Sequence, residues 1–120
     1  MKIVFISGPL VTGGDGSMEY IQKNVRIAEE YAFALAKKGI GFFCAHIHTS
    51  NHYGKAPEPF YYELDTEILK RSADAVLAVP GWEKSWGAKK EIEWAKEKGM
   101  KIFYPKSPDD IEEIVQWEKL

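Results

Sequence analysis

The sequence lacks the features on which several protein classes depend. It holds one cysteine, Cys44, among 120 residues, which excludes an internal disulfide and suits a reducing compartment. No apolar run approaches the ~20 residues that a membrane-spanning helix needs, and the first residues lack the pattern of a signal peptide. We therefore expect a cytoplasmic protein that makes no contact with a membrane.

A strong excess of one charge is also missing. The 16 Lys and Arg side chains face 18 Asp and Glu, for a formal net charge of -2. Nucleic-acid polymers are bound mainly through clustered positive charge, so we expect no such partner. The Gly54-Lys55 pair is followed by Ala56 and lacks the earlier glycine of a P-loop, and no G-x-G-x-x-G follows the first apolar segment. We expect no cofactor.

What the sequence does contain is an alternation of strand and helix patterns. Short apolar segments predict buried strands at residues 2–7, 40–47, 73–79 and 100–104. Apolar stripes of helical period, with capping residues, predict helices at residues 18–38, 60–72, 85–98 and 108–120. This alternation predicts one domain over residues 1–120, a three-layer flavodoxin- or Rossmann-like α/β fold with a parallel sheet of about four or five strands.

The most informative segment is the third predicted helix, which Ser85 is expected to cap. On a helical wheel, Glu91 falls in the middle of an arc of small and apolar residues that includes Gly87 and Ala88. A carboxylate in that arc must be neutralised, hydrogen-bonded or turned toward a cleft, because burial of an unpaired charge is costly. In parallel α/β folds, the segment after a strand lies where ligands bind. The alternative is that Glu91 pairs with a lysine at the helix edge.

This segment resembles the signature of the nucleoside 2-deoxyribosyltransferase-like superfamily. The matching residues are Pro80, Gly81, Trp82, Ser85, Gly87, Ala88, Glu91 and Ala95, together with Phe5-Ile6-Ser7-Gly8-Pro9 and Asp74-Ala75-Val76. The chain is also similar to the 2'-deoxynucleoside 5'-monophosphate N-glycosidases. The resemblance implies cleavage or exchange of an N-glycosidic bond in a nucleoside or nucleotide. Glu91 would be the nucleophile that forms a glycosyl-enzyme.

The resemblance also implies which residues bind the substrate. Ser85 and Gly87 would hold the 5' end of the sugar or its phosphate, at a helix N-terminus that favours anions. The other residues assigned to substrate binding are Ser7, Gly8, Pro9, His46, Gly81, Trp82 and Ala88. The loop at residues 8–17 is expected to wrap the sugar, with Asn24 or Arg26 close by.

A glycosidase needs a second carboxyl group in a different environment, because an acid must protonate the departing base. Asp65, in the second predicted helix, is the candidate acid or sugar-binding partner; Glu63 and Glu67 are alternatives. Relatives often carry a tyrosine where this chain has Phe5. That departure keeps open a second hypothesis, a nucleotide-binding module without catalysis.

Three histidines, His46, His48 and His52, cluster after the second predicted strand. Alternation along an extended strand would place His46 and His48 on one face, but no nearby Cys or Asp completes a metal site, and Glu58 is the one alternative ligand. We therefore expect no bound metal and assign this segment to the base pocket, where tyrosines at positions 53, 61 and 62 would stack. Enzymes of the group that the chain resembles are often oligomeric, and four Trp residues supply apolar surface for a contact. We therefore expect a homodimer or higher homo-oligomer.

Overall fold

The computed structural model describes residues 1–10, 17–49 and 51–120. Its strands are β1 (Ile3–Ser7), β2 (Gly41–Cys44), β3 (Ala75–Ala78) and β4 (Lys101–Phe103). The helices in these ranges are α1 (Met18–Lys37), α2 (Ala45–His48), α3 (Glu58–Ser72), α4 (Trp86–Glu97) and α5 (Glu112–Glu118), with a short 3-10 helix, η1 (Trp82–Lys84), before α4. The predicted α/β fold is confirmed, and the sheet has four parallel strands.

The strand order is β2-β1-β3-β4, so the chain moves to one side of β1 first and then crosses to the other. Ile6 is in register with Cys44 of β2, and Ser7 with Ala78 of β3. The order therefore reverses between β1 and β3. In an open parallel sheet the crevice outside the carboxyl ends of those two strands is the usual ligand site.

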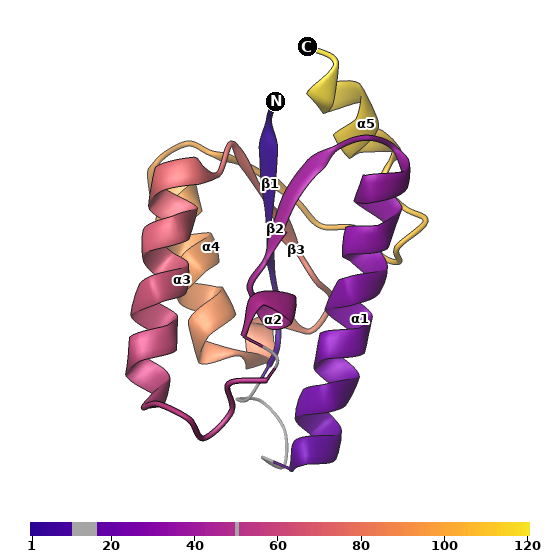
Figure 1. Cartoon of the computed structure of the whole chain (residues 1–120). Helices are drawn as coiled ribbons and strands as arrows, with labels where there is room; N and C mark the ends of the chain where they lie inside the picture. The colour runs from indigo at the N-terminus through magenta and orange to yellow at the C-terminus, as the bar shows by residue number, and fades with distance from the viewer. Residues whose placement is uncertain (11–16, 50) are drawn as a thin grey trace.

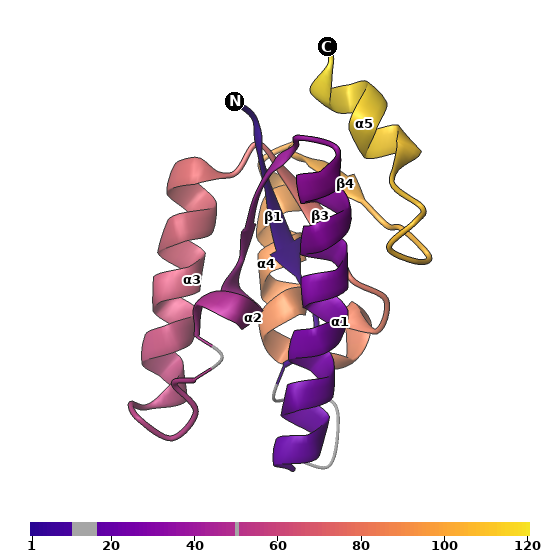
Figure 2. The ribbon, with the colours of Figure 1, turned by 45° about the vertical axis from the view of Figure 1, so that its right-hand side comes forward.

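Helices cover both faces of the sheet, which gives three layers (Figure 1). On one face α1 and α5 pack against Val4, Ile6 and Leu77. On the other face α3 and α4 pack against Phe5 and Val76, so neighbouring residues of one strand serve opposite layers. The two termini lie together at one end of the sheet, while α2 and the N-terminal ends of α1 and α3 gather at the other (Figures 1 and 2). The site must be sought at that second end.

Two predicted elements differ from the structure. The segment predicted as a strand over residues 40–47 is wrong beyond Cys44, because Ala45–His48 forms one turn of helix, closed by Thr49 bonding through both its N–H and its hydroxyl to the Ala45 carbonyl. The closing helix begins at Glu112 rather than Pro108, because Asp110 first closes a turn by accepting from the Lys106 N–H at 2.9 Å. Other element ends shift by one or two residues.

Close packing between strands fixes two details of the sheet. Asp74, expected to cap the turn into its strand, accepts from the Ile3 N–H at 2.8 Å and donates its own N–H to the Ile3 carbonyl. At Gly41 the backbones of β2 and the chain before β1 approach so closely that a Cβ would lie 2.6 Å from the Lys2 carbonyl oxygen. In the part of the chain that the structure describes, no helix combines the length and apolarity of a membrane span.

We predict that Gly41→Ala lowers the free energy of unfolding by about 1–3 kcal/mol, because backbone must move to admit the methyl group. Chemical denaturation monitored by circular dichroism measures the change. Lys89→Ala, at an exposed position of α4, is the control and should leave stability unchanged or slightly raised. Equal stability of Gly41→Ala and the wild type would contradict the close approach.

Candidate functional site

The site is built where β1 ends and α4 begins. Ser85 is the N-cap of α4, as predicted, and its Oγ accepts from the Ala88 N–H at 3.2 Å. One turn further on, Glu91 points back to the sheet and receives a hydrogen bond from Ser7 Oγ at 2.6 Å. The two residues are 84 positions apart in the chain. The fold therefore brings a helix carboxylate onto the last residue of the central strand.

Glu91 is buried, with 9% of its surface exposed, as the helical wheel predicted. Within the described residues no Lys, Arg or His nitrogen lies within ion-pair distance of its carboxylate, so the alternative of a lysine partner is wrong. Burial raises the pKa of Glu91 to about 8; the Asp65 charge adds to this rise, and the Ser7 hydrogen bond opposes it. In the free protein at neutral pH the carboxyl group is mostly protonated.

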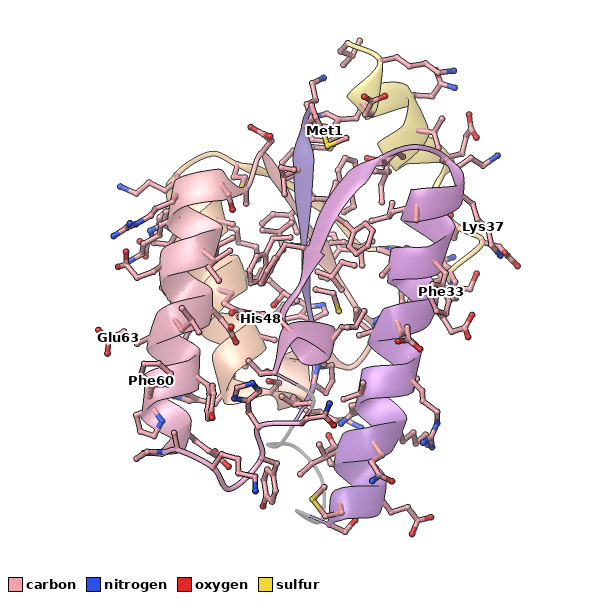
Figure 3. The ribbon with its side chains drawn as sticks, viewed as in Figure 1. Met1, Phe33, Lys37, His48, Phe60 and Glu63 are labelled. Atoms are coloured by element: carbon pink, nitrogen blue, oxygen red, sulfur yellow. The ribbon has the colours of Figure 1, made fainter. Side chains whose placement is uncertain are left out.

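Asp65 is the second carboxyl group of the site. It projects from α3 and is half-buried, and one of its oxygens, Oδ1, is buried without a hydrogen-bond partner among the described residues. Burial raises the pKa of Asp65 to about 6. The alternatives Glu63 and Glu67 are exposed, and Glu63 points outward from α3, away from the sheet (Figure 3). Of the three candidates Asp65, Glu63 and Glu67, Asp65 is therefore the one placed to act with Glu91.

Both carboxyl groups open into one cavity of about 350 Å³. Its volume lies in the usual range for small-molecule pockets, ~300–1,000 Å³. Loops and helices from both sides of the sheet line it: Gly8, Leu10, Ile21, Ala45, His46, Thr49, His52, Tyr53, Tyr61, Tyr62, Asp65, Ser85, Trp86, Gly87, Ala88 and Glu91 are among the lining residues. The lining is mostly apolar and aromatic, with a few polar groups, which is the usual composition of a site for a flat organic ligand.

His46 is the one predicted base-pocket histidine that is buried, with 5% of its surface exposed. Its Nε2 lies 2.8 Å from the Pro9 carbonyl oxygen, which can only accept, so Nε2 carries the proton and Nδ1 offers a lone pair. Nδ1 is buried and has no partner in the described residues. Burial lowers the pKa of His46, which keeps the ring neutral. His46 is therefore a fixed hydrogen-bond acceptor in the cavity wall.

His48 is separated from His46 because residues 45–48 are helical rather than extended. His48 packs against Phe43, with ring centroids 5.4 Å apart, and is absent from the described cavity lining. His52 lines the cavity and bonds through Nδ1 to the Tyr61 hydroxyl at 3.1 Å. Among the described residues no three His, Cys, Asp or Glu side chains are grouped as a metal would require.

The remaining predicted residues serve the site in different ways. Gly8, Gly87 and Ala88 line the cavity, as does Ser85. Ser7 and Pro9 contact lining residues instead: the Ser7 hydroxyl donates to Glu91, and the Pro9 carbonyl accepts from His46. Gly81 and Trp82 are not among the described lining residues; Gly81 adopts a left-handed φ of 94° where η1 begins, and Trp82 packs on the apolar face of the sheet. Both belong to the turn that connects β3 to α4.

Gly87 differs from Gly8 in how much space a side chain would have at its position. A Cβ at Gly8 would lie 2.7 Å from the Cβ of Val79, so packing between two strand ends requires that glycine. At Gly87 a Cβ would meet only the Tyr62 ring, at an ordinary 3.6 Å. Glycine costs a helix ~1 kcal/mol relative to alanine. Since the fold does not require Gly87, the open backbone there is available to a ligand.

Sequence reasoning missed part of the cavity wall. Trp86, one of the four Trp residues on which the expected oligomer rests, stacks on Tyr62 with ring centroids 4.9 Å apart and lines the cavity. Ile21 of α1 and Thr49 after α2 also line it. The signal for Trp86 in the sequence is its position directly before Gly87. Of the predicted sugar-wrapping loop, residues 11–16 lie outside the described residues, and Arg26 lies in an adjoining groove that shares Ile21 and Tyr53 with the cavity.

Residues 2–104 match the model of a protein family whose description is "Domain of unknown function (DUF4406)". The match contains every residue of the cavity and ends before α5. No curated protein matches the chain.

The buried carboxyl group makes stability depend on pH. The pKa of Glu91 is raised on folding from 4.5 to about 8, so the folded protein holds a proton that the unfolded chain releases, and stability is lost as pH rises through this window. We predict that Glu91→Gln gains stability over the wild type as pH rises from 4.5 to 9, by roughly 2–4 kcal/mol at the upper end. Urea unfolding across that range measures it.

Glu97→Gln, on the exposed side of the same helix, is the matched control and should follow the wild type at every pH. A constant difference between Glu91→Gln and the wild type from pH 4.5 to 9 would show that Glu91 is ionised in the folded protein.

Proposed function

Because the chain belongs to the DUF4406 family, whose description names no activity, we propose its function from the site itself: it cleaves or exchanges the N-glycosidic bond of a nucleoside or nucleoside 5'-monophosphate, with Glu91 as the nucleophile. The observation that carries the proposal is the pair of carboxyl groups, Glu91 and Asp65, opening into one cavity at the strand switch point. The same pair supports kinship with the nucleoside 2-deoxyribosyltransferase-like superfamily.

Glycosidic bond cleavage needs one carboxylate and one proton. The transition state resembles an oxocarbenium ion, which a carboxylate stabilises or traps, and the departing base must be protonated. The pKa values of about 6 for Asp65 and about 8 for Glu91 mean that the pair together holds close to one proton near neutral pH. A pair of carboxyl groups whose environments separate their pKa values is the usual basis for acid and nucleophile roles.

The proposed step balances as follows. Positive charge that develops at the anomeric carbon favours the ionised form of Glu91, whose proton passes by way of Asp65 to the departing base. A Glu91 oxygen forms a bond to the anomeric carbon while the C–N bond breaks. The electron pair of the C–N bond leaves with the base. Water, or a ring N–H of a second base, then attacks the same carbon and breaks its bond to Glu91. The proton that the attacking group loses passes by way of Asp65 back to the pair, which restores its starting state. The cavity wall excludes bulk water from this charge separation.

Ser7 supplies the hydroxyl donor to Glu91 that the Phe5 side chain lacks. The hypothesis of a binding module without catalysis rested on the missing tyrosine hydroxyl at position 5. Phe5 is in the core, 1% exposed and stacked on Phe43, whereas Ser7, two residues further along the same strand face, donates to Glu91. A donor to the glutamate is therefore present, which favours the catalytic proposal over the binding module. The homo-oligomer and the cytoplasmic location stay predictions.

We predict that the wild type releases free base from at least one member of a panel of ribo- and deoxynucleosides and their 5'-monophosphates, read by chromatography. Glu91→Gln should lower the rate by about a thousandfold or more, because it removes the nucleophile while keeping the size of the side chain. Glu97→Gln is the control. An unchanged rate in Glu91→Gln and Glu91→Ala would end the proposed mechanism.

We also predict a bell-shaped pH dependence of kcat/KM, with limbs near pH 6 and pH 8, since activity needs the pair to hold one proton. Asp65→Asn should lower the rate about 10²–10⁴-fold. It should also move the alkaline limb to lower pH, because the Asp65 charge no longer raises the pKa of Glu91. Glu63→Gln, on the outward face of α3, should keep both limbs. A limb that Asp65→Asn does not move would separate Asp65 from the reaction.

A further inference from the structure

Among the described residues, two buried polar atoms of the cavity wall are hydrogen-bond acceptors that receive no donor. His46 Nδ1 and Asp65 Oδ1 are both buried and both without a partner in the described residues. Unmet buried acceptors are costly, and the cost is removed when a ligand supplies N–H or O–H donors. His46 cannot switch roles, because its proton is held toward the Pro9 carbonyl and burial keeps the ring neutral.

Acidic side chains predominate in the described wall. The described lining residues include Asp65, Glu91 and Glu58 and no Lys or Arg. The sequence of residues 11–16, Val-Thr-Gly-Gly-Asp-Gly, contains no cation either. The positive contribution comes from the N-terminus of α4, equivalent to about half a charge. One ionised carboxylate outweighs it.

From these acceptors and charges we infer that the cavity selects an uncharged nucleoside, whose hydroxyl and base N–H donors pair with Asp65 and His46, and rejects the corresponding 5'-monophosphate. That the ligand is a nucleoside rests on the proposed function. That it is uncharged rests on the residues of the cavity wall alone. Asp65 is then a specificity-determining residue as well as a member of the reacting pair. A phosphate dianion near the pair would also hold the Glu91 proton in place and oppose ionisation of the nucleophile.

The test measures binding rather than turnover. In the Glu91→Gln background, calorimetry at pH 7.5 and low salt compares each nucleoside of the panel with its own 5'-monophosphate. We expect the nucleoside to bind about tenfold or more tightly than the monophosphate. Adding Asp65→Asn should narrow that ratio by about threefold or more, because it removes the repelling charge and keeps the side chain's size. Adding Glu63→Gln, outside the cavity, should leave the ratio unchanged.

Arg26 provides the decisive control, because its groove adjoins the cavity. If Arg26→Ala weakens the monophosphate and not the nucleoside, phosphate has a site of its own and the inference is overturned. It is overturned equally if the monophosphate binds as tightly as the nucleoside, if Asp65→Asn leaves the ratio unchanged, or if nothing in the panel binds.

The two proposals fail separately. Base release from monophosphates alone would preserve the glycosidase and end the charge selection. Selective nucleoside binding without base release from any compound would preserve the charge selection and end the glycosidase.

Discussion

The hydrogen bond from Ser7 to Glu91, 2.6 Å long and buried, ties the last residue of the central strand to the first turns of α4. Everything else at the site is arranged around the need to hold a carboxyl group there. Ser7 is the last residue of β1, beside the switch point of the sheet. Ser85 caps the start of α4, and Ala88, 2% exposed, lets this helix lie close to the strands. Burial disfavours the charged form of a carboxyl group in this position, which is why the pKa of Glu91 is raised.

Local sequence was sufficient for the parts of this site that depend on one element. The wheel placed Glu91 in the apolar arc because helical period alone decides which face a residue takes. The cap at Ser85 followed from the preference of serine for that position. The layers and the parallel sheet followed from alternating patterns. Such features need no knowledge of distant residues.

What the sequence could not supply depends on contacts between distant segments or on competition between near-equal local conformations. The partner of Glu91 is 84 residues away, and no pattern in α4 names Ser7. Residues 45–48 fit a strand by their apolar alternation, yet they turn into helix, and that single turn takes His46 to the Pro9 carbonyl while His48 goes to Phe43. No local pattern places Trp86 in the pocket, because its stacking on Tyr62 of α3 is a tertiary contact.

The distribution of unmet polar groups separates this site from the rest of the fold. Elsewhere in the described residues, a buried polar side chain has a partner that stabilises the chain: the Asn24 amide donates to the Leu10 carbonyl at 3.0 Å. In the cavity, His46 and Asp65 keep acceptors without partners, and Glu91 keeps a raised pKa. A protein interior tolerates such groups where the stability they cost is returned by another interaction. Because all three line the same cavity, the proposed nucleoside would have to place its donors so that it meets all of them together.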